Sequence, residues 1–284
     1  MGANHQKEIE FLCDIAQPTH GLITNVGMAH LDGFGGFEGV KKGKAELYAH
    51  LKKTAGTAFV YRDSLELMDM SAKAGLEKVV YYGKDETNSI HGHLLQSDPF
   101  IELQWANERE SFVAKANLTG SYNFENILAA LCIGHFFGIQ PADMNRGLAE
   151  YFPNNNRSQL TQTAHNTVIC DFYNANPSSM AAALKNLSTL SAKHKTAIIA
   201  DMFELGAAAP GQHEAIIKLA QMSDLNELIF IGQNFYAWKD HYQGSFFTTP
   251  LEARTYLETR PIKDSLILLK GSRGMALEQL LPLL

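Results

Sequence analysis

An apolar run, a glycine-rich loop and an amphipathic helix follow one another within residues 21–53, and few architectures accommodate all three. We predict a buried strand over residues 21–26 and a helix over residues 37–53, with His30 in the loop between them. Loops that leave the carboxyl ends of strands hold the chemistry of open α/β sheets. The stretch therefore predicts an α/β fold with a site near His30.

Lys44 interrupts the apolar stripe of this predicted helix. At about 100° per residue, Lys44 falls in the same narrow arc as Val40 and Leu47. A buried ammonium group is costly. The side chain must therefore extend to the surface, pair with an anion, lose its proton or be chemically changed. The spacing alone leaves these alternatives open.

Composition and charge exclude several classes of function. Charged residues make up 19% of the 284-residue chain and the net charge is −6, with no long basic run, so nothing indicates a nucleic-acid surface. The three cysteines lie in apolar runs without paired spacing, which is typical of reduced core residues. No apolar run reaches the roughly 18 residues of a membrane span. We expect a cytoplasmic protein that binds neither nucleic acid nor membrane.

The order of the predicted elements indicates two domains. The first contains βα units followed by short antiparallel strands over residues 89–117. A proline followed by three asparagines reads as a linker, and strands and helices alternate after it as in a doubly wound, Rossmann-like sheet. We place the boundary at residue 155, which gives domains 1–155 and 156–284. The dinucleotide fingerprint G-x-G-x-x-G is missing, so no NAD site follows.

Polar residues at strand ends and helix starts are the remaining candidates for binding. They are Asn123, Asn126, Arg157, Asp171, Asn174, Asn176, Lys270, Ser272 and Arg273. Each has a plain alternative, because asparagine and aspartate often cap helices and exposed lysine and arginine are often only solvated. The turn Lys270-Gly-Ser-Arg favours an anion through its backbone N–H groups and its two cations. His91 and His93 share a strand face, but no third metal ligand lies near them in the sequence.

The run TNVGMAHLDGFGGFEGVKKGKAEL resembles the central domain of the Mur ligases, the ATP-dependent enzymes that add amino acids to the peptidoglycan precursor. With GSYNFENILAA, DFYNANPSSM and KGSR in the same order, the chain most resembles the branch that adds D-alanyl-D-alanine, over nearly its whole length. The resemblance implies that His30 binds a magnesium ion. It also implies that Lys44 is carbamylated and so becomes an anionic ligand of that metal.

The resemblance further implies an ATP-dependent ligation. ATP phosphorylates the carboxylate of UDP-MurNAc-tripeptide, and the amine of D-Ala-D-Ala attacks the acyl phosphate. Asn123, Asn126, Arg157 and Asp171 would contact the nucleotide. Asn174, Asn176, Lys270, Ser272 and Arg273 would contact the other substrates. Tyr122 stands where the family has histidine. ATP and Mg²⁺ are the implied cofactors, and we expect a monomer.

One family motif does not occur in residues 1–284. The phosphate loop G-x-x-x-x-G-K-[ST] is missing, and the glutamate that binds metal in the family would precede Met1. We therefore expect this chain alone to bind ATP weakly and not to catalyse ligation. The alternatives are a non-catalytic binding remnant on a ligase scaffold and a folylpolyglutamate-synthase-like ligase, against which DFYNANPSSM argues.

Overall fold

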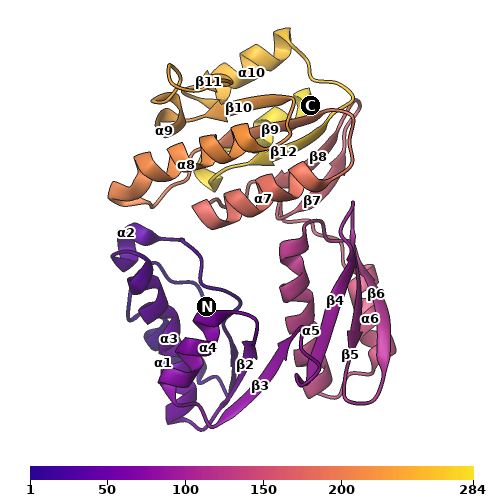
Figure 1. Cartoon of the computed structure of the whole chain (residues 1–284). Coiled ribbons are helices and arrows are strands. Elements are labelled where there is room, and N and C mark those ends of the chain that lie inside the picture. Colours follow the sequence, from indigo (N-terminus) through magenta and orange to yellow (C-terminus); the bar gives the residue numbers. More distant parts are fainter. The chain divides into compact units, whose positions relative to one another are not determined.

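The computed structural model describes residues 1–284, which form two compact units (Figure 1). Unit 1 comprises Met1–Asn117 and Ser121–Tyr151, and unit 2 comprises Leu118–Gly120 and Phe152–Leu284. Each unit has its own six-stranded sheet. The predicted α/β fold is confirmed, with a mixed first sheet and a Rossmann-like second one.

The strands of unit 1 lie in the sheet in chain order. They are β1 (His20–Leu22), β2 (Thr57–Tyr61), β3 (Lys78–Gly83), β4 (Ile90–Gln96), β5 (Ile101–Ala106) and β6 (Ser111–Ala116). The first four strands pair in parallel, and β4, β5 and β6 pair antiparallel, as predicted for residues 89–117. The helices are α1 (Glu8–Ala16), α2 (Leu31–Phe34), α3 (Phe37–Lys53), α4 (Leu65–Ala74), α5 (Phe124–Phe136) and α6 (Pro141–Glu150), with a 3₁₀ turn η1 (Ser121–Asn123).

The glycines of α3 explain how the glycine-rich loop folds onto that helix. Phe34 at the end of α2 is buried against α3. A Cβ atom at Gly39 would overlap the carbonyl group of Phe34, and one at Gly43 would overlap its ring. Because only glycine permits this approach, the loop that carries His30 is held close to the helix that carries Lys44.

The strand predicted over residues 21–26 is shorter than expected. β1 pairs with β2 only from His20 to Leu22, and the chain then leaves the sheet although Ile23 is still buried. An apolar run indicates burial but does not distinguish a strand from a buried loop. The loop before His30 is therefore longer than predicted, and α2 was not anticipated.

Unit 2 has the strand order β11-β10-β9-β12-β8-β7. The strands are β7 (Gln159–Gln162), β8 (Thr167–Asp171), β9 (Lys195–Ala200), β10 (Glu227–Ile231), β11 (Ser245–Phe247) and β12 (Leu266–Lys270). All neighbours are parallel except β7, an antiparallel edge strand that the sequence analysis did not predict. Parallel strands bring the ends of β8, β9 and β12 to one edge of the sheet.

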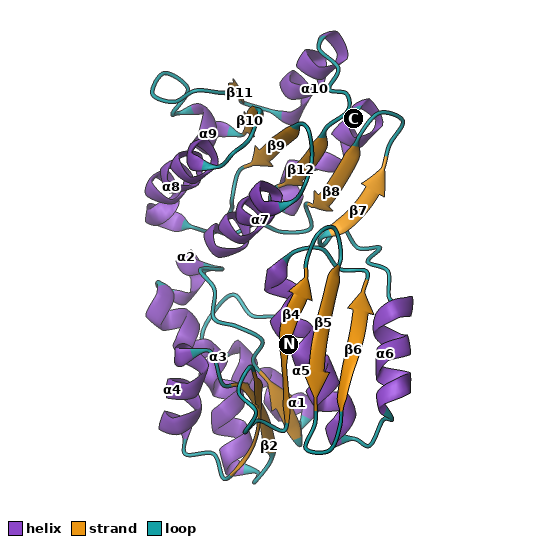
Figure 2. Cartoon of the chain, turned by 45° about the vertical axis from the view of Figure 1, so that its right-hand side comes forward, coloured by secondary structure: helices purple, strands orange, loops and turns teal.

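The helices of unit 2 connect these strands, and α7 and α8 lie side by side (Figure 2). They are α7 (Pro177–Thr189), α8 (Ala209–Met222), α9 (Gln233–Tyr236) and α10 (Pro250–Thr259), with the 3₁₀ turns η2 (Gly206–Ala208), η3 (Arg273–Met275) and η4 (Leu277–Leu283). The chain ends in 3₁₀ rather than α-helical turns, and Pro282 lies within η4. Neither unit contains a helix with the length and apolarity of a membrane span.

Candidate functional site

A buried ion pair lies at the carboxyl edge of the unit 2 sheet. Asp171 ends β8, Lys270 ends β12, and the two residues are register partners on adjacent parallel strands. The Nζ atom of Lys270 lies 2.7 Å from Oδ2 of Asp171, and Lys270 is 1% exposed. The Lys270 ammonium also donates to the carbonyl of Asn174 at 3.3 Å. Two motifs 99 residues apart are thus joined by one interaction.

This pairing limits what Lys270 can do for a ligand. Its ammonium donates to the carboxylate and the carbonyl of Asp171 as well as to Asn174. A substrate carboxylate would have to replace one of these protein oxygens. The predicted substrate contact of Lys270 stays a prediction, and the geometry favours a role in positioning the two loops.

Ser272 follows Lys270 and is also buried. Its hydroxyl oxygen accepts a hydrogen bond from the backbone N–H of Phe203 at 3.0 Å, which ties the KGSR turn to the loop after β9. In the same loop, Asp201 accepts from the N–H groups of Asn234 and Phe235 at the start of α9. The carboxylate of Asp201 therefore fixes a helix start.

Buried His213 fixes the same loop and is neutral. Its Nδ1–H donates to the carbonyl of Ala209 at 2.7 Å, and its Nε2 accepts from the N–H of Met202 at 3.0 Å. Burial lowers the pKa of His213, and the hydrogen bond to Ala209 and the carboxylate of Asp201 oppose the shift only in part. From the sequence, the stretch 201–206 and the following His213 are expected to be largely structural, and these hydrogen bonds agree with that expectation.

Two predicted binding arginines meet on one aromatic ring. The guanidinium of Arg157 lies 4.1 Å from the ring centroid of Tyr173, and that of Arg273 lies 5.4 Å from the same centroid. All three residues are exposed. The sequence analysis had assigned the two arginines to different substrates and had not singled out Tyr173.

The two asparagines of DFYNANPSSM differ in whether their side-chain amides can still bind a ligand. Asn176 caps α7, because its Oδ1 accepts from the N–H of Ser179 at 2.9 Å in a reciprocal capping box. Asn174 is exposed, and its Oδ1 accepts from the N–H of Ala175. Asn176 therefore shapes the loop, while the amide nitrogen of Asn174 remains accessible to a ligand.

In unit 1, Asn123 and Asn126 lie at the start of α5, next to a pocket. The Nδ2 of Asn126 donates to Oδ1 of Asn123 at 3.1 Å. The pocket has a volume of about 540 Å³, and its lining includes Tyr61, Tyr122 and Glu125. Burial raises the pKa of Glu125. The structure thus joins both predicted asparagines by a hydrogen bond, and their chain neighbours Tyr122, Phe124 and Glu125 line the pocket.

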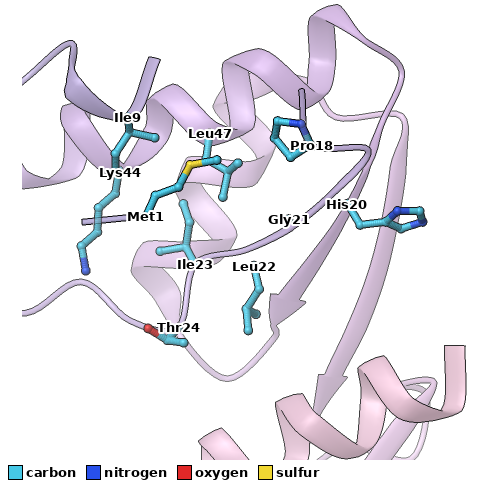
Figure 3. A pocket seen from close by; sticks show the side chains of 10 residues that line it. All are labelled: Met1, Ile9, Pro18, His20, Gly21, Leu22, Ile23, Thr24, Lys44 and Leu47. Atoms are coloured by element: carbon cyan, nitrogen blue, oxygen red, sulfur yellow. The ribbon is translucent and has the colours of Figure 1, made fainter. Parts of the chain in front are cut away.

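Lys44 is half-buried between α3 and the loop after β1. Its Nζ donates to the carbonyl of Asn25 at 2.6 Å, and burial lowers its pKa. Lys44 lines a pocket of about 290 Å³ and extends toward the segment that contains Thr24 (Figure 3). The alternative in which Lys44 extends freely to the surface is not what the structure shows.

His30 begins α2 in a left-handed conformation, with φ at 54°, and its carbonyl accepts from the N–H of Phe34 at 3.1 Å. A positive φ is uncommon for a residue other than glycine, so the surrounding structure holds the backbone at His30 in place. His91 and His93 line a separate pocket of about 300 Å³ together with Glu86. No group of three or more His, Cys, Asp or Glu side chains is placed to hold a metal ion in the structure.

Comparisons with known proteins identify relatives of the whole chain. The Mur ligase middle domain matches residues 1–134, and the Mur ligase glutamate ligase domain matches residues 156–273. The UDP-N-acetylmuramoyl-tripeptide–D-alanyl-D-alanine ligase of Treponema pallidum is 30% identical over 295 residues, which cover 100% of this chain and 62% of the relative.

Solved structures agree with these sequence matches. The crystal structure of MurF from Acinetobacter baumannii matches with a TM-score of 0.87 at 28% identity, covering 99% of this chain and 62% of that one. MurF from Thermotoga maritima in complex with ADP matches with a TM-score of 0.84, covering 100% and 65%, and at 22% identity it supports the fold alone. The chain spans about 62% of the length of the first of these relatives.

The ion pair between Lys270 and Asp171 predicts that Lys270→Met strongly lowers the stability of unit 2. The substitution leaves the Asp171 carboxylate, which is 15% exposed, without its cation, so we expect unit 2 to lose about 3 kcal/mol of stability, the lower end for a buried pair. Adding Asp171→Asn should recover part of the loss, and Lys263→Met at an exposed position should cost less than about 0.5 kcal/mol. Urea unfolding followed by hydrogen-exchange mass spectrometry separates the two units. A loss no greater than that of Lys263→Met would exclude a structural role for the pair.

The neutral state of His213 predicts that the stability of the folded chain depends on pH. Because the folded pKa is below the ordinary value of 6.5, the unfolded chain binds a proton that the folded chain does not as pH falls below 6.5. Stability is complete above that pH and should fall by at most about 1.4 kcal/mol per pH unit below it. His213→Gln should flatten the slope between pH 7.5 and 5.5, whereas exposed His241→Gln should not. Equal slopes in all three proteins would contradict the assignment.

Proposed function

The chain belongs to the Mur ligase family, and on that basis we propose that it carries binding sites of an ATP-dependent ligase that joins D-Ala-D-Ala to UDP-MurNAc-tripeptide. The observation that carries the proposal is the ion pair between Asp171 and Lys270. It joins DFYNANPSSM to KGSR at one sheet edge, in a chain that aligns along its whole length with a D-alanyl-D-alanine ligase. We place the activity in cytoplasmic peptidoglycan precursor synthesis by a monomer.

The proposed reaction has two steps. The terminal phosphoryl group of ATP is transferred to the free carboxylate of the tripeptide, which gives an acyl phosphate and ADP. The neutral amine of D-Ala-D-Ala then attacks the acyl carbon and forms a tetrahedral intermediate. The bond between carbon and phosphate oxygen breaks, inorganic phosphate leaves, and the former amine loses a proton as the amide forms. Activation is needed because a carboxylate alone is a poor acceptor for an amine.

Two sets of residues are candidates for nucleotide binding, and each set is argued within its own unit. Asn123 and Asn126 present amide groups beside the unit 1 pocket and suit the edge of a base or a ribose hydroxyl. In unit 2, exposed Arg157 suits a phosphate group. Oδ1 of Asp171 accepts from the N–H of Ser158 at 3.2 Å and Oδ2 accepts from Lys270 at 2.7 Å, and each oxygen has a second lone pair that could accept from a ribose hydroxyl.

The amino substrate and the acceptor peptide are assigned to unit 2. Arg273 and Asn174 are exposed and present donors that suit the carboxylate and the peptide group of D-Ala-D-Ala. Lys270, Ser272 and Asn176 are buried or half-buried and engaged by the protein, so we assign them mainly to shaping the loops. This division follows from which polar atoms remain exposed.

Lys44 and His30 are proposed to hold a magnesium ion once Lys44 is carbamylated. Carbon dioxide reacts with a neutral amine: the N–C bond forms, the nitrogen releases a proton, and a carbamate anion remains. The lowered pKa of Lys44 favours this reaction because it raises the neutral fraction of the amine. Carbamate oxygens are ligands that Mg²⁺ accepts, and a bound Mg²⁺ would offset charge on phosphate oxygens during transfer.

Substrate selectivity tests the proposed function. Isothermal titration of the 284-residue chain should detect D-Ala-D-Ala but not L-Ala-L-Ala, and a folate polyglutamate should not compete. Asn126→Ala should weaken ADP binding about 3- to 10-fold, as expected for loss of one hydrogen bond. Asn154→Ala, in the exposed linker, is the matched control. Binding of the folate compound without D-Ala-D-Ala binding would overturn the proposal.

The carbamate can be observed directly. In buffer with ¹³C-labelled bicarbonate, the chain should show a carbamate resonance that grows as pH rises, because the neutral amine is the reactive form. Lys44→Arg should abolish the resonance, since arginine stays protonated. Lys42→Arg, at an exposed position of the same helix, should retain it. An unchanged resonance in Lys44→Arg, or none in the unsubstituted chain, would argue against carbamylation of Lys44.

A further inference from the structure

Arg157 and Arg273 form an uncompensated pair of cations at the surface of unit 2. Both guanidinium groups lie over the ring of Tyr173, which is 39% exposed. Neither is paired with a carboxylate in unit 2. The third cation at this sheet edge, Lys270, is compensated by Asp171. The positive charge left at the edge therefore resides on the two arginines.

The backbone around Tyr173 is fixed by contacts to both neighbouring segments. The N–H of Tyr173 donates to the carbonyl of Asn156 at 3.3 Å, next to Arg157. The N–H of Ser158 donates to Asp171, and the Lys270 ammonium donates to the carbonyl of Asn174. The segments that carry the two arginines and the tyrosine are thus joined to one another. This arrangement exists before any ligand binds, which reduces the entropic cost of binding.

Two guanidinium groups on one ring repel each other, and the ring compensates only in part. The negative face of an aromatic ring attracts each cation, with an effect that is modest at exposed positions. An anion bound by both arginines would remove the repulsion. Guanidinium groups bind phosphate through paired N–H donors, and a phosphate has enough oxygens to occupy two such forks. A phosphate therefore fits this pair better than a carboxylate, which has two oxygens and one charge.

We propose that Tyr173 is a positioning residue that holds Arg157 and Arg273 together as one phosphate-binding clamp. The inference rests on the proposed function and revises one assignment in it, because Arg273 then contacts the phosphate rather than the carboxylate of D-Ala-D-Ala. The phosphate belongs to the nucleotide before transfer and to the acyl phosphate after it. Tyr173 itself does not touch the phosphate and acts through the two arginines.

The test uses inorganic pyrophosphate as the probe and the ¹⁵N-labelled 284-residue chain. Pyrophosphate should shift the side-chain Nε–H signals of Arg157 and Arg273 with one shared dissociation constant. Tyr173→Leu removes the ring and should raise that constant about 5- to 30-fold, from two cation–π contacts at exposed positions. Tyr173→Phe keeps the ring and should stay within about 2-fold of the unsubstituted chain. A purely structural role would instead lower the melting temperature in Tyr173→Leu without this rescue pattern.

Arg260 provides a matched control, because it lies 5.3 Å from the ring of Tyr256 without a second arginine on that ring. Arg260→Ala should leave pyrophosphate binding unchanged. In a shared site, Arg157→Ala and Arg273→Ala should each weaken pyrophosphate binding, and their effects should not add in the double variant.

The possible failures are distinguishable. If Arg273→Ala weakens only D-Ala-D-Ala binding and Arg157→Ala weakens only pyrophosphate binding, the arginines serve separate sites. The clamp is then refuted and the proposed function stands. Unshifted arginine signals at millimolar pyrophosphate also refute the clamp. If pyrophosphate binds as expected but D-Ala-D-Ala does not bind at all, the clamp stands and the proposed function fails.

Discussion

The ion pair between Lys270 and Asp171 is the interaction on which the candidate site of unit 2 depends. Moving two charges out of water is costly, and their attraction compensates only when the geometry is good. Adjacent parallel strands provide that geometry here, because the two residues are register partners at the ends of β8 and β12. A shift of one residue in the pairing would move one side chain to the other face of the sheet and leave its charge alone.

The pair also decides which polar groups remain available to a ligand. Lys270, Ser272 and Asn176 carry the chemical groups expected of a binding site, yet each is engaged by another part of the protein. Their hydrogen bonds hold the loops after β8, β9 and β12 in place. The exposed groups lie on the loop after β12, which carries Arg273, and on the segment before β7, which carries Arg157. Buried polar residues thus position the exposed ones.

Unit 1 follows the same principle with different chemistry. Gly39 and Gly43 allow the loop before α3 to pack directly on that helix through Phe34. On the same helix, the Lys44 ammonium donates to the carbonyl of Asn25, and burial lowers the pKa of the lysine. A lysine that would be an ordinary surface cation elsewhere is half-buried at this position, and its ammonium is held by a backbone carbonyl.

Local patterns determined much of the fold from sequence alone. The helix predicted over residues 37–53 is α3 in the structure, and the antiparallel strands predicted over residues 89–117 are β4, β5 and β6. Periodicity and capping are local signals, and Thr249 followed by Pro250 marks a helix start without reference to the rest of the chain. The family resemblance likewise identified the polar residues at the strand ends. The sequence analysis did not predict β7, because this short edge strand has no strong local pattern of apolar residues.

Tertiary structure alone decided which of those residues meet. Nothing in the order of the motifs indicates that Asp171 pairs with Lys270, because that contact follows from the placement of β12 between β8 and β9. Arg273 reaches Tyr173 through the same placement, and Arg157 reaches it through the antiparallel pairing of β7 with β8. Local sequence determined which helices and strands form and which residues they carry. The residues that meet were determined by strand order and register, which only long-range pairing sets.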